Sequence, residues 1–211
     1  MTEAEWLECG EPETLVEFLR SRTTDRKCRL VAVALCRHVL PLVRDQCGLL
    51  AVEVSEQFAD GRSGLEEMLA ISERVGDAYV SMPNPVPVNT EPPVSFKAES
   101  AALQSTMFLT GDSDDYLAAC CRCTYLAALR WAFLRAGPGN TVYAPNPVIQ
   151  WQIQVIKEVI GNPFRPVAFD PDWRTSTVVA LAAGIYDEKA FERLPLLADA
   201  LEAAGARTTT S

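Results

Sequence analysis

The sequence predicts an all-α protein, a compact, bundle-like domain of several helices with a proline-rich central linker and one irregular loop. Signals for helix starts and stops recur along the chain, and the apolar residues between them fall at helical spacing. The composition agrees with this fold class, because a chain of 211 residues with 48% apolar residues can bury a substantial core without disulfides or metal.

The first eighty residues carry start signals for five helices. Thr2 and Glu5 have the spacing of a capping box, and Pro12 suits a first helical position. Between Asp25 and Pro41 apolar residues cover most of the helix surface, which predicts a central, buried helix. The expected helices run from Thr2 to Gly10, from Pro12 to near Arg20, from Thr24 or Asp25 to Pro41, from about Leu42 to Phe58, and from a Ser63–Glu66 capping box through Val75.

Residues 81–96 read SMPNPVPVNTEPPVSF, and their five prolines and single charge exclude a helix. We expect an extended, polyproline-like connection between an N-terminal helical region at 1–80 and a C-terminal helical region at 97–211. The two helical regions are expected to pack together as one domain. A docking peptide for an aromatic groove is the alternative for this segment, but it lacks a spaced basic residue, which favours a linker.

Five further helices are expected after the linker. The acidic residues from Asp112 to Asp115 suit a helix start, because carboxylates complement the positive end of the helix dipole. The segment GNPFRPVAFDPDW is expected to form a loop packed over the helices, since its three prolines preclude regular structure. The predicted helices span 97–109, 115–136, about 146–160, 177–188 and 194–204.

Residues 148–155, VIQWQIQV, fit two kinds of secondary structure. Apolar and polar residues alternate as in a half-buried strand, yet the apolar side chains also occupy a single arc of a helix of roughly 200°. Pro147 and the stop at 161–163, GNP, favour the helix. Gln152 would then lie within the apolar arc and need a hydrogen-bond partner.

The charge balance argues against two classes of partner. With 19 basic and 28 acidic residues, the net charge of −9 does not suit nucleic acid or an anionic membrane. The basic run from Arg20 to Arg29 is interpreted as a solvated helix start. We expect neither a secretory signal nor a membrane span. Seven cysteines, an odd number, indicate reduced thiols and a cytoplasmic location.

The segment 120–123, Cys-Cys-Arg-Cys, is the densest cluster of reactive side chains. A structural zinc site needs four ligands, usually as two spaced pairs, and the chain has no second CxxC or Cys-His pair. Buried cysteine packing is therefore the favoured interpretation. The alternative is a cysteine-based metal-binding or redox protein, in which Cys120 and Cys123 would act with His38, the only histidine.

Common catalytic motifs do not occur in the sequence. It contains no GxxxxGK(S/T), GxGxxG, GxSxG or HExxH string. A single histidine also excludes a histidine-rich metal site. We therefore expect no cofactor and favour a protein without catalytic activity.

The opening MTEAEWL, the GNPFRPV loop and the block YDEKAFERLPLLADALE together resemble a family of paralogous proteins from planctomycete bacteria that has no assigned activity. The matching blocks lie near both ends and, with their flanking residues, cover roughly half of the chain. The resemblance implies a helical fold in a bacterial protein. Family members carry an alanine-rich middle where this chain has its proline-rich segment, and they continue into a tail that contains Cys and His.

These observations favour a non-catalytic interaction or regulatory module whose partner is another protein. The candidate binding surface is the NPFRP loop, with Phe164, Arg165, Phe169 and Trp173, whose aromatic side chains would also anchor the loop. The sequence specifies no oligomeric state.

Overall fold

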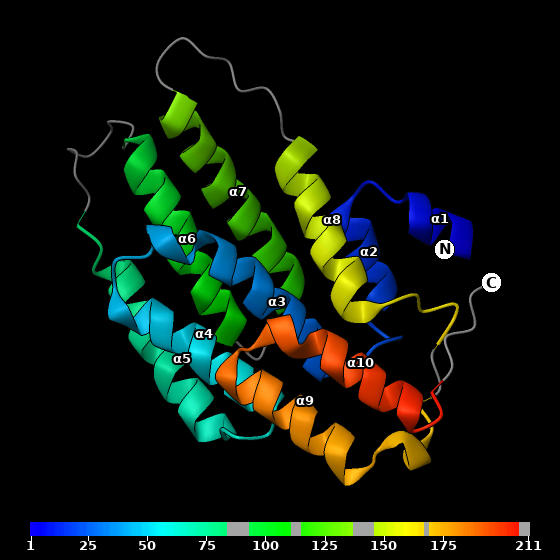
Figure 1. Cartoon of the computed structure of the whole chain (residues 1–211). Helices are drawn as coiled ribbons and strands as arrows, with labels where there is room; N and C mark the ends of the chain where they lie inside the picture. The colour runs from blue at the N-terminus through cyan, green and yellow to red at the C-terminus, as the bar shows by residue number, and fades with distance from the viewer. Residues whose placement is uncertain (84–92, 111–114, 137–145, 167–168, 207–211) are drawn as a thin grey trace. The chain divides into compact units, whose positions relative to one another are not determined.

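The computed structural model describes residues 1–83, 93–110, 115–136, 146–166 and 169–206. Within these ranges the chain is all-α, without strands, which confirms the predicted fold class (Figure 1). The α-helices are α1 (Glu3–Glu8), α2 (Pro12–Leu19), α3 (Asp25–Val39), α4 (Gln46–Ala59), α5 (Leu65–Val80), α6 (Val94–Thr110), α7 (Tyr116–Ala136), α8 (Asn146–Ile160), α9 (Ser176–Glu188) and α10 (Leu194–Ala203). Short 3₁₀ helices are η1 (Leu40–Leu42), η2 (Pro171–Trp173) and η3 (Phe191–Arg193).

The chain forms two compact units, Met1–Phe164 and Arg165–Ser211. Helices from both sides of the predicted linker at 81–96 belong to the first unit, because α4 and α5 pack against α6 and share a buried core with it. The chain therefore divides at 164/165, within the region predicted as 97–211, and not at the proline-rich segment.

Several helices begin where the capping signals predict. The Thr2 hydroxyl accepts a hydrogen bond from the Glu5 amide, and the Glu5 carboxylate accepts one from the Thr2 amide, which completes the expected capping box. The Thr24 hydroxyl caps α3 by accepting from the Lys27 amide. Pro12 is the first residue of α2. Local signals thus set these three helix starts.

The start of α5 differs from the prediction. Gly64 occupies the N-cap position, and the Ser63 hydroxyl donates to the carboxylate of Glu67 at 2.7 Å. The expected capping box between Ser63 and Glu66 is therefore wrong: the Ser63 hydroxyl bonds an acid one turn along the helix and caps no amide. The helix then runs on to Val80.

The starts of α4 and α6 also differ. Asp45 caps α4 by accepting from the Cys47 amide, so this helix begins after the predicted position near Leu42. The helix α6 begins at Val94, inside the predicted linker at 81–96. Pro93 directly precedes its first turn, where a helix makes no use of the missing amide hydrogen.

The helix α3 lies at the centre of the first unit, as its apolar surface predicts. It packs against α4, α6, α7 and α8, and Figure 1 shows it crossing α6 and α7. Leu35 and Ile156 lie in one buried cluster, and Val39 and Leu103 lie in the other. Both core clusters therefore depend on where α3 is placed.

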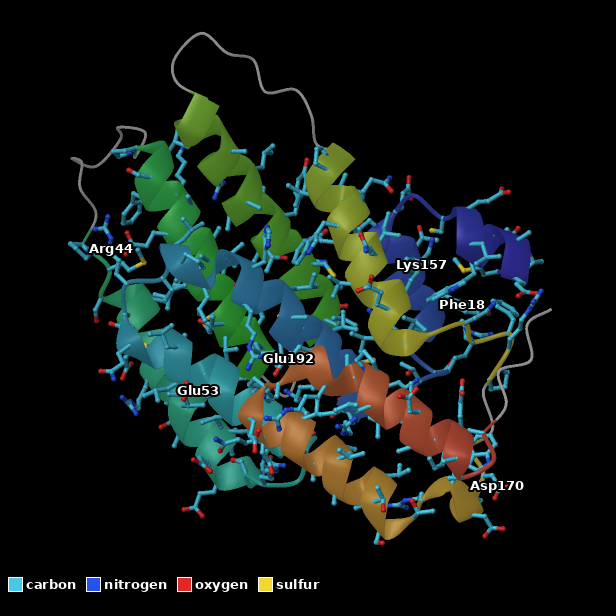
Figure 2. The ribbon with its side chains drawn as sticks, in the orientation of Figure 1. Phe18, Arg44, Glu53, Lys157, Asp170 and Glu192 are labelled. Atoms are coloured by element: carbon cyan, nitrogen blue, oxygen red, sulfur yellow. The ribbon has the colours of Figure 1, made fainter. Side chains whose placement is uncertain are left out.

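The N-terminal helices are held against the end of α8. Figure 2 shows Phe18 and Lys157 on the side of the unit where α1 lies. The Lys157 ammonium donates to the Leu7 carbonyl at 2.9 Å, and the Asn162 side-chain amide donates to the carboxylate of Glu3 at 2.7 Å. These bonds join residues more than 140 positions apart in sequence, so α1 is fixed by tertiary contacts as well as by its cap.

The first residues of α3 place cations at the ends of three other helices. Arg26 pairs with Asp60, the C-cap of α4, at 2.7 Å, and the Lys27 ammonium donates to the carbonyl of Ile160, the last residue of α8, at 2.9 Å. A cation stabilises a helix C-terminus because the last carbonyls lack partners within the helix. The basic run was expected to be a solvated helix start: Arg26 and Lys27 are exposed as expected, whereas Arg29 is buried.

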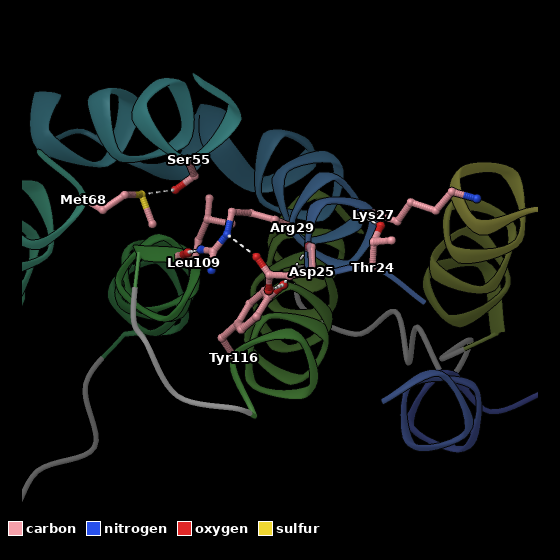
Figure 3. Close-up of polar contacts among 8 residues, drawn as sticks. All are labelled: Thr24, Asp25, Lys27, Arg29, Ser55, Met68, Leu109 and Tyr116. Atoms are coloured by element: carbon pink, nitrogen blue, oxygen red, sulfur yellow. Dashed lines mark hydrogen bonds and ion pairs between the residues drawn. The ribbon is translucent and has the colours of Figure 1, made fainter. Parts of the chain in front are cut away.

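Arg29 is the buried member of this group and serves the end of α6. Figure 3 shows Arg29 beside Leu109 and Tyr116: its Nη1 donates to the Leu109 carbonyl at 2.9 Å, and its guanidinium lies over the ring of Tyr116. The guanidinium also lies over the ring of Phe58. Asp25 balances the charge from one turn away, at 3.6 Å from Nε. The Tyr116 hydroxyl donates to Asp25, and burial raises the pKa of Tyr116, so the phenol stays protonated.

The segment 148–155 is helical and lies within α8. Gln152 is buried in the apolar arc of this helix, and its Nε2 donates to the Cys121 carbonyl at 2.8 Å and to the Thr124 hydroxyl at 2.9 Å. The expected need for a hydrogen-bond partner is thus met by α7. These bonds fix the position of α8 against α7.

Gly48 allows a close approach near the start of α4. A Cβ atom at this position would lie 2.5 Å from Cγ1 of Val43 and 3.4 Å from side-chain atoms of Leu103 and Thr106. The valine side chain is branched at Cβ and has little rotational freedom to move away. Gly48 is therefore required by packing between α4, α6 and the residue that follows η1.

We expect Gly48→Ala to lower the free energy of unfolding by about 1 kcal/mol. Overpacking costs roughly 1–3 kcal/mol, which exceeds the gain of about 1 kcal/mol in helix propensity. Gly76→Ala is the matched control, because a Cβ there meets nothing within 4 Å, and it should stabilise the protein by about 0.5–1 kcal/mol. Urea unfolding measures both changes. Equal effects of the two substitutions would contradict the packing argument.

We expect Arg29→Ala to lower the free energy of unfolding by about 3 kcal/mol, because it leaves the Leu109 carbonyl buried without its donor and removes the cation between two rings. The control is Arg44→Ala, whose ion pair with Glu99 is exposed and should contribute about 0.5 kcal/mol. If Arg29→Ala cost no more than this control in urea unfolding, Arg29 would not stabilise the helix ends.

Candidate interaction surface

The second unit is built around a hairpin of two helices. The Thr175 hydroxyl caps α9 by accepting from the Val178 amide. Lys189 ends the helix in the left-handed conformation, with φ of 54°, and its amide donates to carbonyls of the last turn. Pro195 stands in the first turn of α10, where it is tolerated. These local signals bring α10 back along α9.

The hairpin exposes large apolar side chains. Val178 and Ile185 of α9 are buried, while the apolar side chains in the following group are 46% to 54% exposed. They are Phe169, Val179, Phe191, Leu194 and Leu196, which we call the hairpin apolar group. Two paired helices can cover only one side of each other, so apolar residues on the remaining sides stay in contact with water. Exposed groups of this kind mark protein interaction sites.

A groove of about 560 Å³ lies along one side of α9. Ala180 and Gly184 form its small-residue floor, and a Cβ at Gly184 would meet nothing within 4 Å. Arg193 lines its edge and pairs with Glu188 at 2.7 Å. Apart from Arg193, the groove is lined by hydroxyl and aliphatic side chains. It suits the binding of an apolar side chain and offers no nucleophile paired with a base.

The four residues of the predicted surface fall into both units. Phe164 closes the first unit, where its ring stacks on Phe18 with centroids 5.5 Å apart. In the second unit Phe169 meets Trp173 edge to face at 5.5 Å, and Arg165 is exposed. Phe164 therefore anchors the loop to α2. The surface role of all four residues stays a prediction.

The cysteines near position 120 pack in the interior of the first unit. The thiols of Cys36 and Cys120 both donate to the Ser105 carbonyl at 3.4 Å. Burial raises the pKa of Cys120 well above its usual value, that of Cys121 to about 12 and that of Cys123 to about 11. Protonated thiols are weak nucleophiles and weak metal ligands. This packing agrees with the favoured interpretation of the cluster.

His38 packs against α8. Its ring stacks on that of Trp151 in α8, with centroids 4.0 Å apart and planes inclined by 25°. Across the described ranges, no three His, Cys, Asp or Glu side chains are grouped so that they could hold a metal ion. A metal or redox role of Cys120, Cys123 and His38 stays a prediction.

Apart from Phe169, sequence reasoning missed the hairpin apolar group, although α10 carries a signal for it. Leu197 and Leu201 lie one turn apart and form the half-buried side of this helix. Leu196 projects about 100° away from Leu197, where an ordinary surface helix carries polar residues. An apolar residue outside the buried arc is the feature that could have indicated a second contact surface.

No family model, curated protein or solved structure matches the chain. The resemblance to a planctomycete family thus stays a prediction. Among the helices that the structure describes, none is both long and apolar enough to cross a membrane.

We expect the protein to lose stability as the pH falls, in part through His38. Burial lowers the pKa of His38 below its unfolded value near 6.5, so the unfolded chain takes up the proton first. The contribution of His38 is complete above that value and falls as the pH drops through it toward the folded pKa. Urea unfolding at pH 7.5 and pH 5.5 should show a smaller decrease for His38→Gln than for the natural chain. An equal decrease would show that His38 has no part in it.

Proposed function

We propose that this protein is a non-catalytic protein-interaction module and that the hairpin of α9 and α10 binds the partner. The observation that carries the proposal is the hairpin apolar group, which lies on both helices, on η3 and, with Phe169, on the preceding loop, and remains about half exposed. A partner that covered these side chains would remove apolar surface from water, at about 25 cal/mol for each Å² buried.

The shape of the hairpin indicates the chemistry of the partner. Ala180 and Gly184 leave room for a bulky apolar side chain in the groove of α9. Leu194 and Leu196 lie at different angles around α10, so a partner would contact this helix on more than one side. Interfaces of this kind draw most of their affinity from a few buried apolar anchors. The partner is therefore expected to present apolar side chains.

The alternative is a cysteine-based metal-binding or redox protein, which would use the cluster at 120–123. Such chemistry requires thiolates. Burial holds the pKa of Cys121 and Cys123 at about 12 and 11, so few thiolates exist at neutral pH. The buried thiols thus support packing, and the exposed hairpin supports binding.

We expect the double substitution Leu194→Glu and Leu196→Glu to weaken partner binding by at least thirtyfold, which corresponds to about 2 kcal/mol. The tagged full chain is purified gently from the cells in which it occurs, and native mass spectrometry measures the stoichiometry of the retained partner. The control is Leu7→Glu on α1, which changes a leucine that is 58% exposed.

The proposal is supported if one partner binds the natural chain and the control at fixed stoichiometry and is lost from the double variant. Circular dichroism checks that both variants fold. Retention of the partner by the double variant would show that the interface lies elsewhere on the protein. A natural chain purified without a partner, or with a stoichiometric metal, would overturn the proposed function.

A further inference from the structure

In the first unit, the helix α5 also carries exposed apolar side chains. Met68, Ile71 and Val75 face inward, and Leu65 and Val80 lie on one flank of the helix beside this buried face. Leu65 is 59% exposed, Leu69 is 46% exposed and Val80 is 84% exposed. At 100° per residue, Leu65, Leu69, Gly76 and Val80 fall within an arc of about 60°. We call these four residues the α5 row.

The α5 row has the dimensions of a helix-binding surface. At 1.5 Å per residue it extends over about 22 Å, or roughly four helical turns. Gly76 lies between the bulky residues, and a Cβ there would meet nothing within 4 Å. A shallow place between Leu69 and Val80 is thus open to a side chain from a facing helix, as in ridges-into-grooves packing.

An acidic border runs beside the α5 row on one side. Glu66, Glu73 and Asp77 project about 80° to 120° around the helix from Leu65, and all three are exposed. Within the described part of the chain, none of these three carboxylates has an ion-pair partner. The opposite border carries the uncharged Met68 and Tyr79. The surface is therefore apolar along its centre and negative along one side.

We propose that the α5 row binds a helix of a partner protein, one with an apolar stripe bordered by lysine or arginine. Charge complementarity selects this occupant, because among the described residues none of the three carboxylates of the border takes part in an ion pair. An anionic membrane would be repelled by them. In a second copy of the chain, Arg74 is the only basic residue of α5, and it lies about 60° beyond Asp77, away from the α5 row, so self-pairing along the row places no cation of α5 against the acids.

The acidic border should affect the salt dependence of binding more than its strength. Exposed ion pairs contribute about 0.2–1 kcal/mol each and weaken as salt increases. The apolar row supplies most of the affinity, since burial of a leucine contributes about 2 kcal/mol. Apolar and charge variants are therefore expected to differ in their response to salt.

The test uses an 18-residue helical peptide with one leucine stripe and lysines beside it, and a matched peptide with glutamate in place of lysine. Fluorescence anisotropy measures the binding of each peptide to the full chain. The lysine peptide should bind at least tenfold more tightly than the glutamate peptide at low salt. Leu69→Asn should weaken its binding at least tenfold, while Leu126→Asn, at an exposed leucine of α7, should not.

A second set of variants separates the acidic border from the overall charge. Glu66→Gln, Glu73→Gln and Asp77→Asn together should weaken binding about threefold to tenfold and remove most of its salt dependence. The matched control neutralises Glu8, Glu53 and Glu202, which carry the same charge on other helices. Equal losses in the two triple variants would show general attraction to an acidic protein and would overturn the proposal.

Other outcomes distinguish this surface from the hairpin. The double variant Leu194→Glu and Leu196→Glu should bind the lysine peptide as the natural chain does, because neither residue belongs to the α5 row. The experiment therefore tests this proposal independently of the proposed function. Unchanged peptide binding by Leu69→Asn would overturn it. It would also be overturned if Leu69→Asn changed the oligomeric state in sedimentation experiments while peptide binding stayed constant, because the occupant would then be a second copy.

Discussion

The first unit depends on the charges at the start of α3. The last carbonyls of a helix have no partners within that helix, and cations placed there stabilise it. Arg26, Lys27 and Arg29 serve the ends of α4, α8 and α6 from a single turn of α3. Because these three side chains leave one helix so close together, they join α3 to the ends of three of its neighbours. Residues of α3 lie in both core clusters, so the position of α3 also affects which helix faces meet in each cluster.

Small side chains allow α6 and α7 to pack against each other over a long contact. The helices α6 and α7 meet through alanines, hydroxyl residues and thiols, among them Ala102, Ser105, Cys120 and Thr124. The hydroxyls of Ser105 and Thr124 donate to carbonyls of their own helices, so burial leaves neither without a partner. A thiol is larger than a methyl group and still largely apolar, which suits it to this interface. Packing in the interior thus accounts for the cysteines. The proposed binding surfaces instead consist of exposed apolar side chains, with acidic residues beside those of α5.

Apart from the Ser63–Glu66 box, prediction succeeded where a local interaction decides the structure and failed where a distant residue competes. The caps at Thr2 and Thr24 were predictable, because each bond joins residues three apart. Gln152 was predictable as a buried amide, but its acceptors on α7 were not. Within the candidate surface, Phe164 was expected to anchor the loop, but the ring on which it stacks, that of Phe18, was not predictable. No pattern within the NPFRP loop could indicate that contact, because Phe18 lies on another helix.

The sequence by itself determined that the chain is all-α, where most helices begin, and that the segment around Gln152 requires internal hydrogen bonds. Helical periodicity and caps are properties of neighbouring residues, so they can be read along the chain. The tertiary structure alone decided that the cations from Arg26 to Arg29 contact the ends of other helices and that the chain divides at 164/165. It also decided which apolar residues stay exposed on α5 and in the hairpin. A helix with apolar residues on several sides can bury each of them only where another helix is present, and that depends on the whole fold.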